Sequence, residues 1–292
     1  MNKEIHTLVI PDVHGRIFWK EAINKFPKEQ YPNLTIVFLG DYLDPYDFEG
    51  VTKKKAIENF KDIIELAKQD NRIHLLIGNH DMHYWYNARY KCRVDERNYN
   101  KIKDLFLQNF TMFNVAYEEI INNTKYLYTH AGITSFWLNH IKFMGERGIE
   151  MNKIEYIDRL GQKKKKVSDE QLPFCQMLVN MTPTADELNQ MKLNFQGQAL
   201  LWAASFLRGG DDDCGSCIWA DYDEWAYENS GIELENPELK GMWQIFGHSL
   251  AAGGFDEGII NNEKHIAMLD ARQAWVINND GEIIKLKEYA TK

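Results

Sequence analysis

The chain has 292 residues, of which 44% are hydrophobic and 13% aromatic, and its formal net charge is -9. This composition excludes an intrinsically disordered chain and supplies enough apolar residues for a sizeable core. The negative charge gives no general attraction for nucleic acid or for an anionic membrane surface. Because no repeat or linker-like segment interrupts the sequence, we expect a single domain over residues 1–292.

Neither the apolar segments nor the cysteines indicate export. The apolar run at residues 8–11 is shorter than the core of a secretory signal, and no stretch approaches the roughly 18 apolar residues of a membrane span. We therefore expect a cytoplasmic protein with reduced cysteines. Cys214 and Cys217 form a lone CxxC pair, for which an ordinary loop is the main interpretation and a structural zinc or redox site the alternative.

The first 80 residues alternate between two patterns. Apolar runs at residues 6–10, 34–39 and 73–77 predict strands, and helical periodicity at 17–26 and 52–68 predicts helices between them. This β-α-β-α-β order predicts parallel strands with right-handed crossovers. The rest of the chain is less regular, with expected helices at residues 99–110, 135–144, 169–179 and 185–191. Further strands are expected at residues 115–121, 125–129, 243–246, 265–269, 274–277 and 282–286.

Acids, amides and histidines follow the expected strands at the points where the strands end. These residues are Asp12, His14, Asp41, Asp44, Asn79, His80, His130 and His248. The carboxyl ends of parallel strands share one edge of a sheet, where ligands bind. Carboxylate, amide and imidazole groups suit Mn²⁺, Fe or Zn²⁺, and the set exceeds what one tetrahedral ion needs. A two-metal hydrolytic centre accounts for it better than separate turn residues and core histidines.

The order and spacing of these motifs resemble those of the calcineurin-like metallophosphoesterases. The motifs are D-x-H at 12–14, G-D-x-x-D at 40–44, G-N-H-D at 78–81, H-x-G at 130–132, W-x-D at 219–221 and G-H at 247–248. The similarity is greatest to the phosphoprotein phosphatases and their diadenosine-tetraphosphatase relatives. It implies an α/β fold in which helices flank a central β-sandwich.

The resemblance also implies a role for each site residue. Two metal ions would be held by Asp12, His14, Asp41, Asn79, His130 and His248. Mn²⁺ is the preferred metal, and Fe or Zn²⁺ are the alternatives. Asp41 would bridge the ions, and a metal-activated water would hydrolyse a phosphate ester. His80 would protonate the leaving oxygen or steady the transition state, and Asp44 would orient His80.

The sequence departs from the phosphoprotein phosphatases at two places where those enzymes carry arginine. Pro45 follows Asp44, and no arginine lies between Asp221 and His248. Arg16 is the nearest candidate to contact the substrate phosphate, although arginine is usually an exposed surface residue. The sequence therefore leaves three classes of substrate: a phosphorylated small molecule, a nucleotide or a phosphoprotein.

Two functions compete with a protein-phosphatase-like hydrolase. One is hydrolysis of dinucleoside polyphosphates or another nucleotide phosphodiester, and the other is a non-catalytic metal-binding scaffold. Three weaker features each have an alternative interpretation. The aromatic segment 82–86 is interpreted as core packing, with base stacking as the alternative. The lysine run 163–166 is interpreted as a solvated loop, with a docking site for an acidic partner as the alternative. Residues 209–213 are interpreted as a flexible acidic loop, with a cation site as the alternative.

Overall fold

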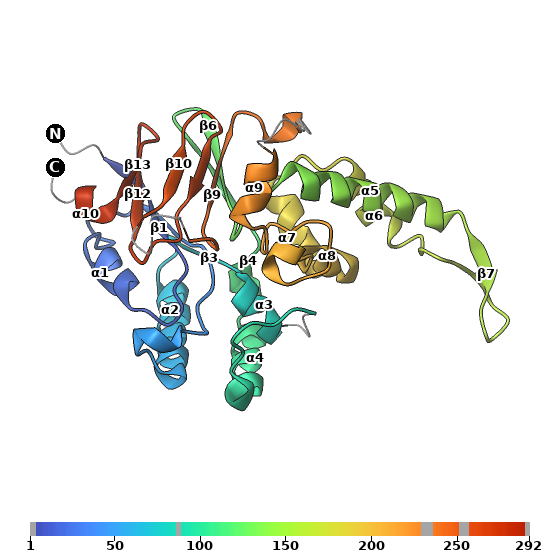
Figure 1. Cartoon of the computed structure of the whole chain (residues 1–292), viewed down its shortest axis with the longest axis horizontal. Helices are drawn as coiled ribbons and strands as arrows, with labels where there is room; N and C mark the ends of the chain where they lie inside the picture. Colours follow the sequence, from blue (N-terminus) through green and yellow to red (C-terminus); the bar gives the residue numbers. More distant parts are fainter. Residues whose placement is uncertain (1–3, 86–88, 229–235, 251–256, 290–292) are drawn as a thin grey trace.

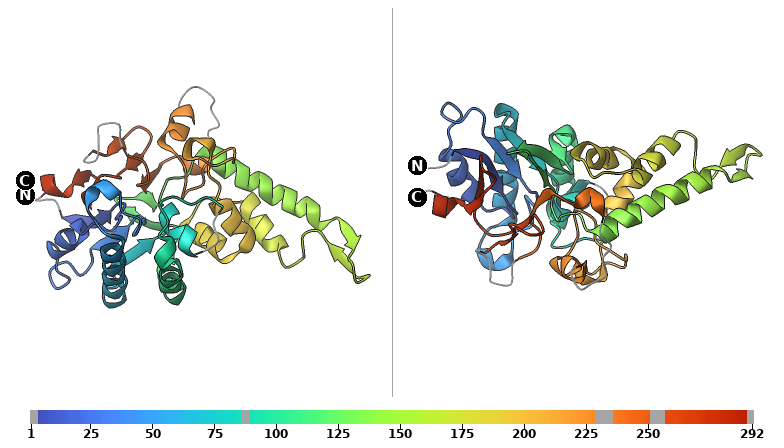
Figure 2. Two further views of the ribbon diagram at one scale, coloured as in Figure 1. Left: turned by 60° about the horizontal axis from the view of Figure 1, so that its bottom comes forward. Right: turned by 90° about the horizontal axis from the view of Figure 1, so that it is seen from above.

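The computed structural model describes residues 4–85, 89–228, 236–250 and 257–289. A six-stranded and a five-stranded sheet form a sandwich, and a long arm projects from one side (Figures 1 and 2). Helices α1 (Phe18–Asn24), α2 (Lys53–Gln69) and α4 (Tyr99–Gln108) lie on the outer face of the six-stranded sheet. The expected β-sandwich flanked by helices is confirmed.

The six-stranded sheet has the order β13-β12-β1-β2-β3-β4. Its strands are β1 (Ile5–Ile10), β2 (Thr35–Phe38), β3 (Ile73–Leu76), β4 (Phe113–Asn114), β12 (Trp275–Asn278) and β13 (Ile283–Lys285). β1, β2, β3 and β4 run parallel, and β12 and β13 form an antiparallel hairpin at one edge. The predicted β-α-β-α-β unit is therefore confirmed.

The five-stranded sheet has the order β10-β11-β9-β6-β5. Its strands are β5 (Tyr117–Ile121), β6 (Thr124–Tyr128), β9 (Met242–Phe246), β10 (Ile259–Asn261) and β11 (Ile266–Met268). β6 pairs with β9 in parallel, so their carboxyl ends lie at the same edge. The turn between β5 and β6 is confirmed, with Asn122 and Asn123 both at positive φ.

Alternating residues of the parallel strands enter two different cores. Val9 and Val37 face the core between the sheets, while Leu8 and Ile36 join the core beneath the helices. In that second core Phe60 of α2 lies fully buried. Burial on both faces explains why these strands read as continuous apolar runs.

The helix α3 (Asn79–Trp85) was not expected from the sequence. All seven of its residues are buried, so no polar face marks a helical period. The burial of Met82, His83, Tyr84 and Trp85 supports the core-packing interpretation of this segment. Tyr86, the last residue of the aromatic segment 82–86, lies outside the described residues.

The arm consists of α5 (Ser135–Asn152), a β7–β8 hairpin (Glu155–Ile157 and Lys163–Lys165) and α6 (Leu172–Val179) (Figures 1 and 2). A Cβ on Gly145 would lie 2.7 Å from the Cys175 carbonyl oxygen, so this glycine permits the close approach of α5 and α6. No helix of the described residues is both long enough and apolar enough to cross a membrane. The other helices are α7 (Ala185–Leu193), α8 (Phe195–Leu201), α9 (Tyr222–Glu228) and α10 (Leu286–Tyr289), with short 3-10 helices at η1 (Asp47–Glu49), η2 (Glu96–Asn98), η3 (Phe110–Met112), η4 (Phe206–Arg208) and η5 (Pro237–Leu239).

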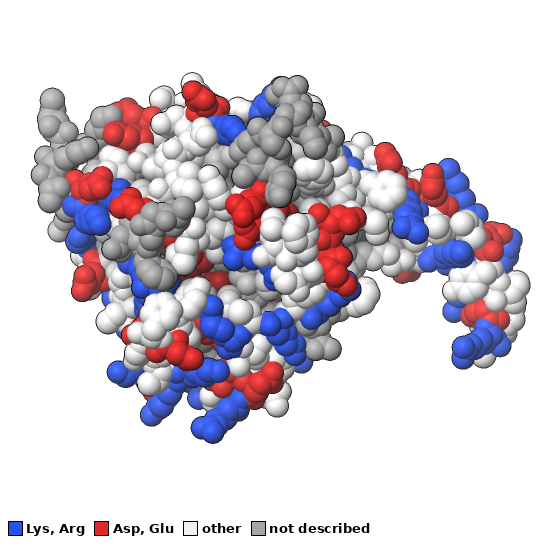
Figure 3. All heavy atoms as spheres, viewed as in Figure 1, with Lys and Arg blue, Asp and Glu red and all other residues white. Residues whose placement is uncertain are grey.

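The lysine run was expected in a solvated loop, and that expectation is wrong for residues 163–165, which form β8. Each lysine of β8 pairs with an acid: Lys163 with Glu155 at 2.5 Å, Lys164 with Asp158 at 3.0 Å and Lys165 with Asp169 at 2.6 Å. Figure 3 shows both charges mixed at the end of the arm. These local partners weaken the interpretation as a docking site for an acidic protein.

Candidate metal centre

The structure gathers the polar residues that follow the strands into one site. Asp12 and His14 follow β1, Asp41 and Asp44 follow β2, Asn79 and His80 begin α3, His130 follows β6, and His248 follows β9. All are buried except His248, which is half-buried. All six residues predicted as metal ligands therefore meet where the carboxyl ends of strands from both sheets converge.

The backbone of this site turns unusually sharply. His14, Asp41, Asp44 and His248 have φ values of 43°, 52°, 57° and 68°, in the left-handed region that side chains rarely adopt. A Cβ on Gly78 would lie 2.1 Å from an Asp41 carboxylate oxygen. Strained residues of this kind persist where the surroundings force them, and they cluster at functional sites.

His14 and Asp41 present hydrogen-bond acceptors to one another. His14 Nδ1 donates to the Leu43 carbonyl at 2.9 Å, which leaves the lone pair of Nε2 facing Asp41 Oδ2 at 3.5 Å. Burial lowers the pKa of His14 to about 3, so the ring is neutral. Two buried acceptors in contact repel each other unless a cation lies between them.

The same arrangement recurs at His130. Its Nδ1 donates to the Leu39 carbonyl at 2.8 Å, as histidine metal ligands commonly do with their second nitrogen. Its Nε2 lies 3.0 Å from Asn79 Oδ1, 3.1 Å from His248 Nδ1 and 3.6 Å from Asp41 Oδ1. Burial lowers the pKa of His130 and of His248, so both rings are neutral. This donor set fits a metal ion with nitrogen and oxygen ligands.

Asp41 belongs to both groups of acceptors. It forms one cluster with His14 and His80 and another with His130 and His248. Burial alone would raise the pKa of its carboxyl, but the surrounding histidines hold that pKa below its usual range, and among them His80 is the protonated ring and also donates its backbone N–H to Asp41 Oδ1 at 2.9 Å. An ionised carboxylate with one oxygen toward each group has the geometry of a bridging ligand.

Further buried carboxylates add to the negative charge. Burial, followed by the nearby Asp41, raises the pKa of Asp12 to about 7. Burial, followed by the nearby Asp12, raises the pKa of Asp270 well above its usual range. Sequence reasoning placed Asp270 only in the strand after the last histidine and gave it no role. A cation held by this site would favour the ionised form of both carboxyls.

His80 lies beside the acceptors and is held by Asp44. The His80 Nδ1 lies 3.1 Å from Asp44 Oδ2, and Asp44 also contacts His83 Nε2 at 2.9 Å and accepts from the Tyr84 hydroxyl at 2.5 Å. Burial lowers the pKa of His80, but Asp41 and Asp44 raise it to about 10. The predicted pairing of Asp44 with His80 is therefore present in the structure, together with two further partners that the sequence did not reveal.

Comparison with known proteins now identifies the family. The family model described as calcineurin-like phosphoesterase matches residues 5–192, which is more than half of the chain. The chain belongs to the calcineurin-like phosphoesterases. It is thus a metal-dependent hydrolase of phosphate esters. His248 and Asp270 lie beyond the matched residues, and the fold brings both to the site.

The chain was also compared with curated proteins and with solved structures. No curated protein matches the chain. Among solved structures, the chain is similar to a protein serine/threonine phosphatase from Saccharomyces cerevisiae, described as having similarity to human phosphatase PP5. The identity is 18%, the alignment covers 97% of this chain and 79% of that chain, and the TM-score is 0.42.

In this calcineurin-like phosphoesterase, Asp81 is not a proposed ligand but holds the backbone of the site in place. Its Oδ2 accepts from the backbone N–H groups of Asp41 at 2.7 Å and Gly78 at 2.8 Å, and its Oδ1 accepts from that of Tyr42 at 3.0 Å. One buried carboxylate thus ties the loop after β2 to the start of α3. The sequence showed Asp81 only as the last letter of a motif.

The sequence prediction named Arg16 as the arginine that contacts the substrate phosphate, but the structure places Arg93 beside His80. Arg16 donates to Glu49 Oε1 at 2.8 Å and to the Asp12 carbonyl at 2.7 Å, so two of its nitrogens already have partners. Arg93, which sequence reasoning missed, has Nη2 3.3 Å from His80 Nε2 and stacks 3.7 Å from the Tyr46 ring centroid. No motif surrounds Arg93, so only the fold shows that it lies at the site.

The cysteine pair and the acidic loop lie outside this centre. Cys214 and Cys217 are buried and form no disulfide among the described residues, and the candidate metal clusters of that part of the chain include no cysteine. Asp211 contacts Arg89 and the Tyr90 hydroxyl. The interpretation of these segments as ordinary loops is therefore favoured over zinc or cation sites.

We predict that Asp81→Asn destabilises the fold, because an amide places an N–H group where the carboxylate accepts backbone N–H groups. The expected loss is about 1–3 kcal/mol in the free energy of unfolding, measured by urea denaturation followed by circular dichroism. Asp62→Asn is the control, since Asp62 is exposed and pairs with the exposed Lys20 at 2.6 Å. Equal midpoints for the two variants would contradict the structural role of Asp81.

Proposed function

We propose that this phosphoesterase hydrolyses a small phosphorylated or nucleotide-like substrate at a two-metal centre. The observation that carries the proposal is the contact between neutral histidine nitrogens and the Asp41 and Asn79 oxygens. Such contacts are repulsive in an empty site and attractive around cations. The expectation of a non-catalytic scaffold does not explain why a histidine held by a carboxylate lies beside these ligands.

The two groups of acceptors divide the proposed ligands between two ions. Asp12 and His14 would hold the first ion, Asn79, His130 and His248 the second, and Asp41 both. The absence of thiolate from this set suits Mn²⁺ first, with Fe or Zn²⁺ as alternatives. When bound, two such ions activate water and neutralise the phosphoryl oxygens.

The remaining groups act on the substrate. His80 carries a proton and would donate it to the leaving oxygen, while Asp44 fixes the orientation of the ring through Nδ1. Arg93, beside His80 Nε2, would contact the phosphate oxygens with its planar guanidinium. Arg16 remains a second candidate for substrate binding, although its contacts with Glu49 and Asp12 favour a structural part.

The proposed substrate class rests on the arginines of the site, because Arg16, Arg208 and Arg272 each already pair with a carboxylate. Arg208, another arginine near the site, pairs with Asp221 at 2.5 Å and donates to the Ser249 hydroxyl. Arg93 is therefore the main arginine candidate among the described residues. An enzyme with fewer phosphate contacts depends more on its metals and on contacts to the rest of the substrate. This supports a compact substrate over a generic phosphopeptide.

We predict that His80→Asn lowers kcat by about 10²–10⁴-fold, because proton transfer to the leaving group contributes that much in other enzymes. Metal content, measured by elemental analysis, should stay near that of the wild type. His140→Asn on α5 is the control for histidine loss away from the site. Loss of metal as severe as the loss of kcat would make His80 a ligand or a structural residue instead.

We predict that Arg93→Ala lowers kcat/KM about tenfold or more, mainly through KM, with the metals retained. Arg97→Ala, an exposed arginine of the neighbouring turn, is the control. Arg16→Ala tests the sequence prediction in the same assay, with a smaller rise in KM expected. A larger effect at Arg16 than at Arg93 would reverse this assignment.

We predict higher kcat/KM for nucleotide substrates than for phosphoserine and phosphothreonine peptides on one metal-loaded preparation. The panel should contain mononucleotides, diadenosine tetraphosphate and bis-p-nitrophenyl phosphate, which separates monoesterase from diesterase activity. Phosphopeptides favoured by about a hundredfold or more would return the protein to the phosphoprotein phosphatases despite its missing arginines.

A further inference from the structure

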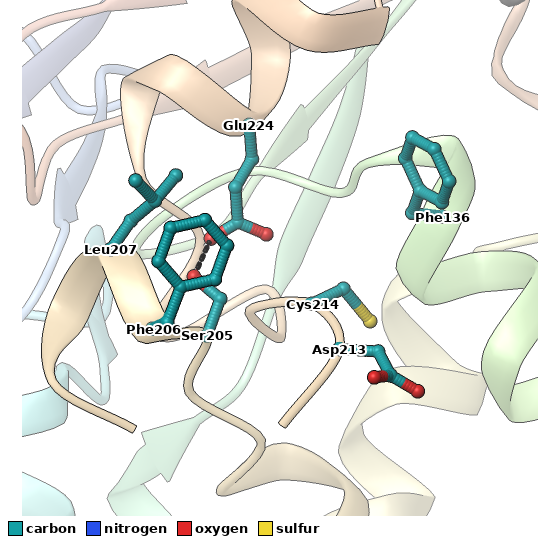
Figure 4. Close-up of a pocket in the computed structure, with 7 residues that line it drawn as sticks. All are labelled: Phe136, Ser205, Phe206, Leu207, Asp213, Cys214 and Glu224. Atoms are coloured by element: carbon teal, nitrogen blue, oxygen red, sulfur yellow. Dashed lines mark hydrogen bonds between the residues drawn. The ribbon is translucent and has the colours of Figure 1, made fainter. Parts of the chain in front are cut away.

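A cavity of about 390 Å³ opens at η4, and it shares no lining residue with the metal centre. It lies between η4 and the first turn of α5, with α9 above it in Figure 4. Its lining residues are Phe136, Ser205, Phe206, Leu207, Asp213, Cys214 and Glu224. A volume of this size lies within the range of small-molecule sites.

The walls of this cavity are mostly apolar. Of its polar groups, Ser205 and Glu224 are hydrogen-bonded to one another, and Asp213 is exposed. Glu224 accepts from the Ser205 hydroxyl at 2.7 Å, from the Gly215 N–H at 2.7 Å and from the Asp221 N–H at 3.0 Å. The cavity therefore offers apolar contact, and the carboxylate of Glu224 disfavours an anion. A second phosphate group is unsuited to it, while an uncharged aromatic group is well suited.

Aromatic side chains stand at the mouth of the cavity with much of their surface exposed. Phe206 is 71% exposed and Phe136 is 38% exposed, and Figure 4 shows them on opposite sides of the opening. An apolar ligand between them would remove both rings from water, which favours binding.

The cavity and the metal centre are joined through one short helix. Leu207 lines the cavity, and the next residue, Arg208, donates to the Ser249 hydroxyl, directly after the proposed ligand His248. Arg208 also pairs with Asp221, whose N–H group donates to Glu224 of the cavity. The Arg208–Asp221 pair thus links the cavity to the end of β9, and a substrate with its phosphate at the metals would extend past this pair to reach the cavity.

We propose that this cavity is the subsite for the organic part of the substrate, and that it selects an uncharged aromatic group. The proposal rests on the two-metal phosphoesterase function, since the phosphate must be held next to the cavity. It refines the substrate class: the preferred substrate carries one phosphate-bearing end and one flat apolar end.

The test measures equilibrium binding of two non-hydrolysable phosphonates to the Mn²⁺-loaded protein by titration calorimetry. 1-Naphthylmethylphosphonate should bind about tenfold or more tightly than methylphosphonate, because only the former carries an aromatic group for the apolar walls. Phe206→Ser and Phe136→Ser should each reduce this ratio severalfold. Phe143→Ser is the control: Phe143 is a 56% exposed aromatic of α5 that does not line the cavity, and its loss should leave the ratio unchanged.

Equal affinities for the two phosphonates, or a ratio that neither cavity variant changes, would overturn the subsite and leave the metal centre intact. Failure of both phosphonates to bind in a Mn²⁺-dependent way would overturn the proposed function and the subsite with it. The two failures are therefore distinguishable in one experiment.

Discussion

Much of this structure follows from one repulsive contact, that between the Asp41 carboxylate and the neutral histidine rings around it. Backbone carbonyls accept hydrogen bonds from Nδ1 of His14 and of His130, so the lone pair on Nε2 of each ring faces Asp41. Such an arrangement is unfavourable in a buried site without a cation. The left-handed backbone at Asp41 and the absence of a side chain at Gly78 both serve to bring these acceptors within a few ångströms of one another.

The sandwich makes this contact possible because it places strand ends from two sheets at one edge. In one sheet β1 and β2 lead to the carboxylates Asp12 and Asp41, and β3 leads to Asn79. In the other sheet the parallel pair β6 and β9 leads to His130 and His248. The backbone N–H of His248 donates to Asp12 at 3.0 Å, which joins the last histidine to the first motif across most of the chain. Asp81 then holds the loop after β2 against α3. The assignment of residues 1–292 to one domain and a cytoplasmic location remain predictions.

The sequence predicted the ligand set because the relevant residues occupy fixed places after strands, and because the motif order resembles one family. It failed where tertiary packing alone decides the outcome. The helix α3 has no polar face to mark its period, and Arg93 reaches His80 from a loop with no motif. Arg16 is near the site as expected, yet its partners Glu49 and Asp12 are visible only in the fold. The β7–β8 hairpin was missed because a lysine run carries no strand pattern.

The metal content of purified protein tests the central claim most directly. Elemental analysis of active protein should find about two transition-metal ions per chain, as a bridged two-metal centre requires. Asp41→Asn should lose both ions together with activity, because the amide carries one neutral oxygen in place of a bridging carboxylate. Asp62→Asn, on the exposed face of α2, should keep both. Active protein without bound metal, or an Asp41→Asn variant that retains two ions, would contradict the account.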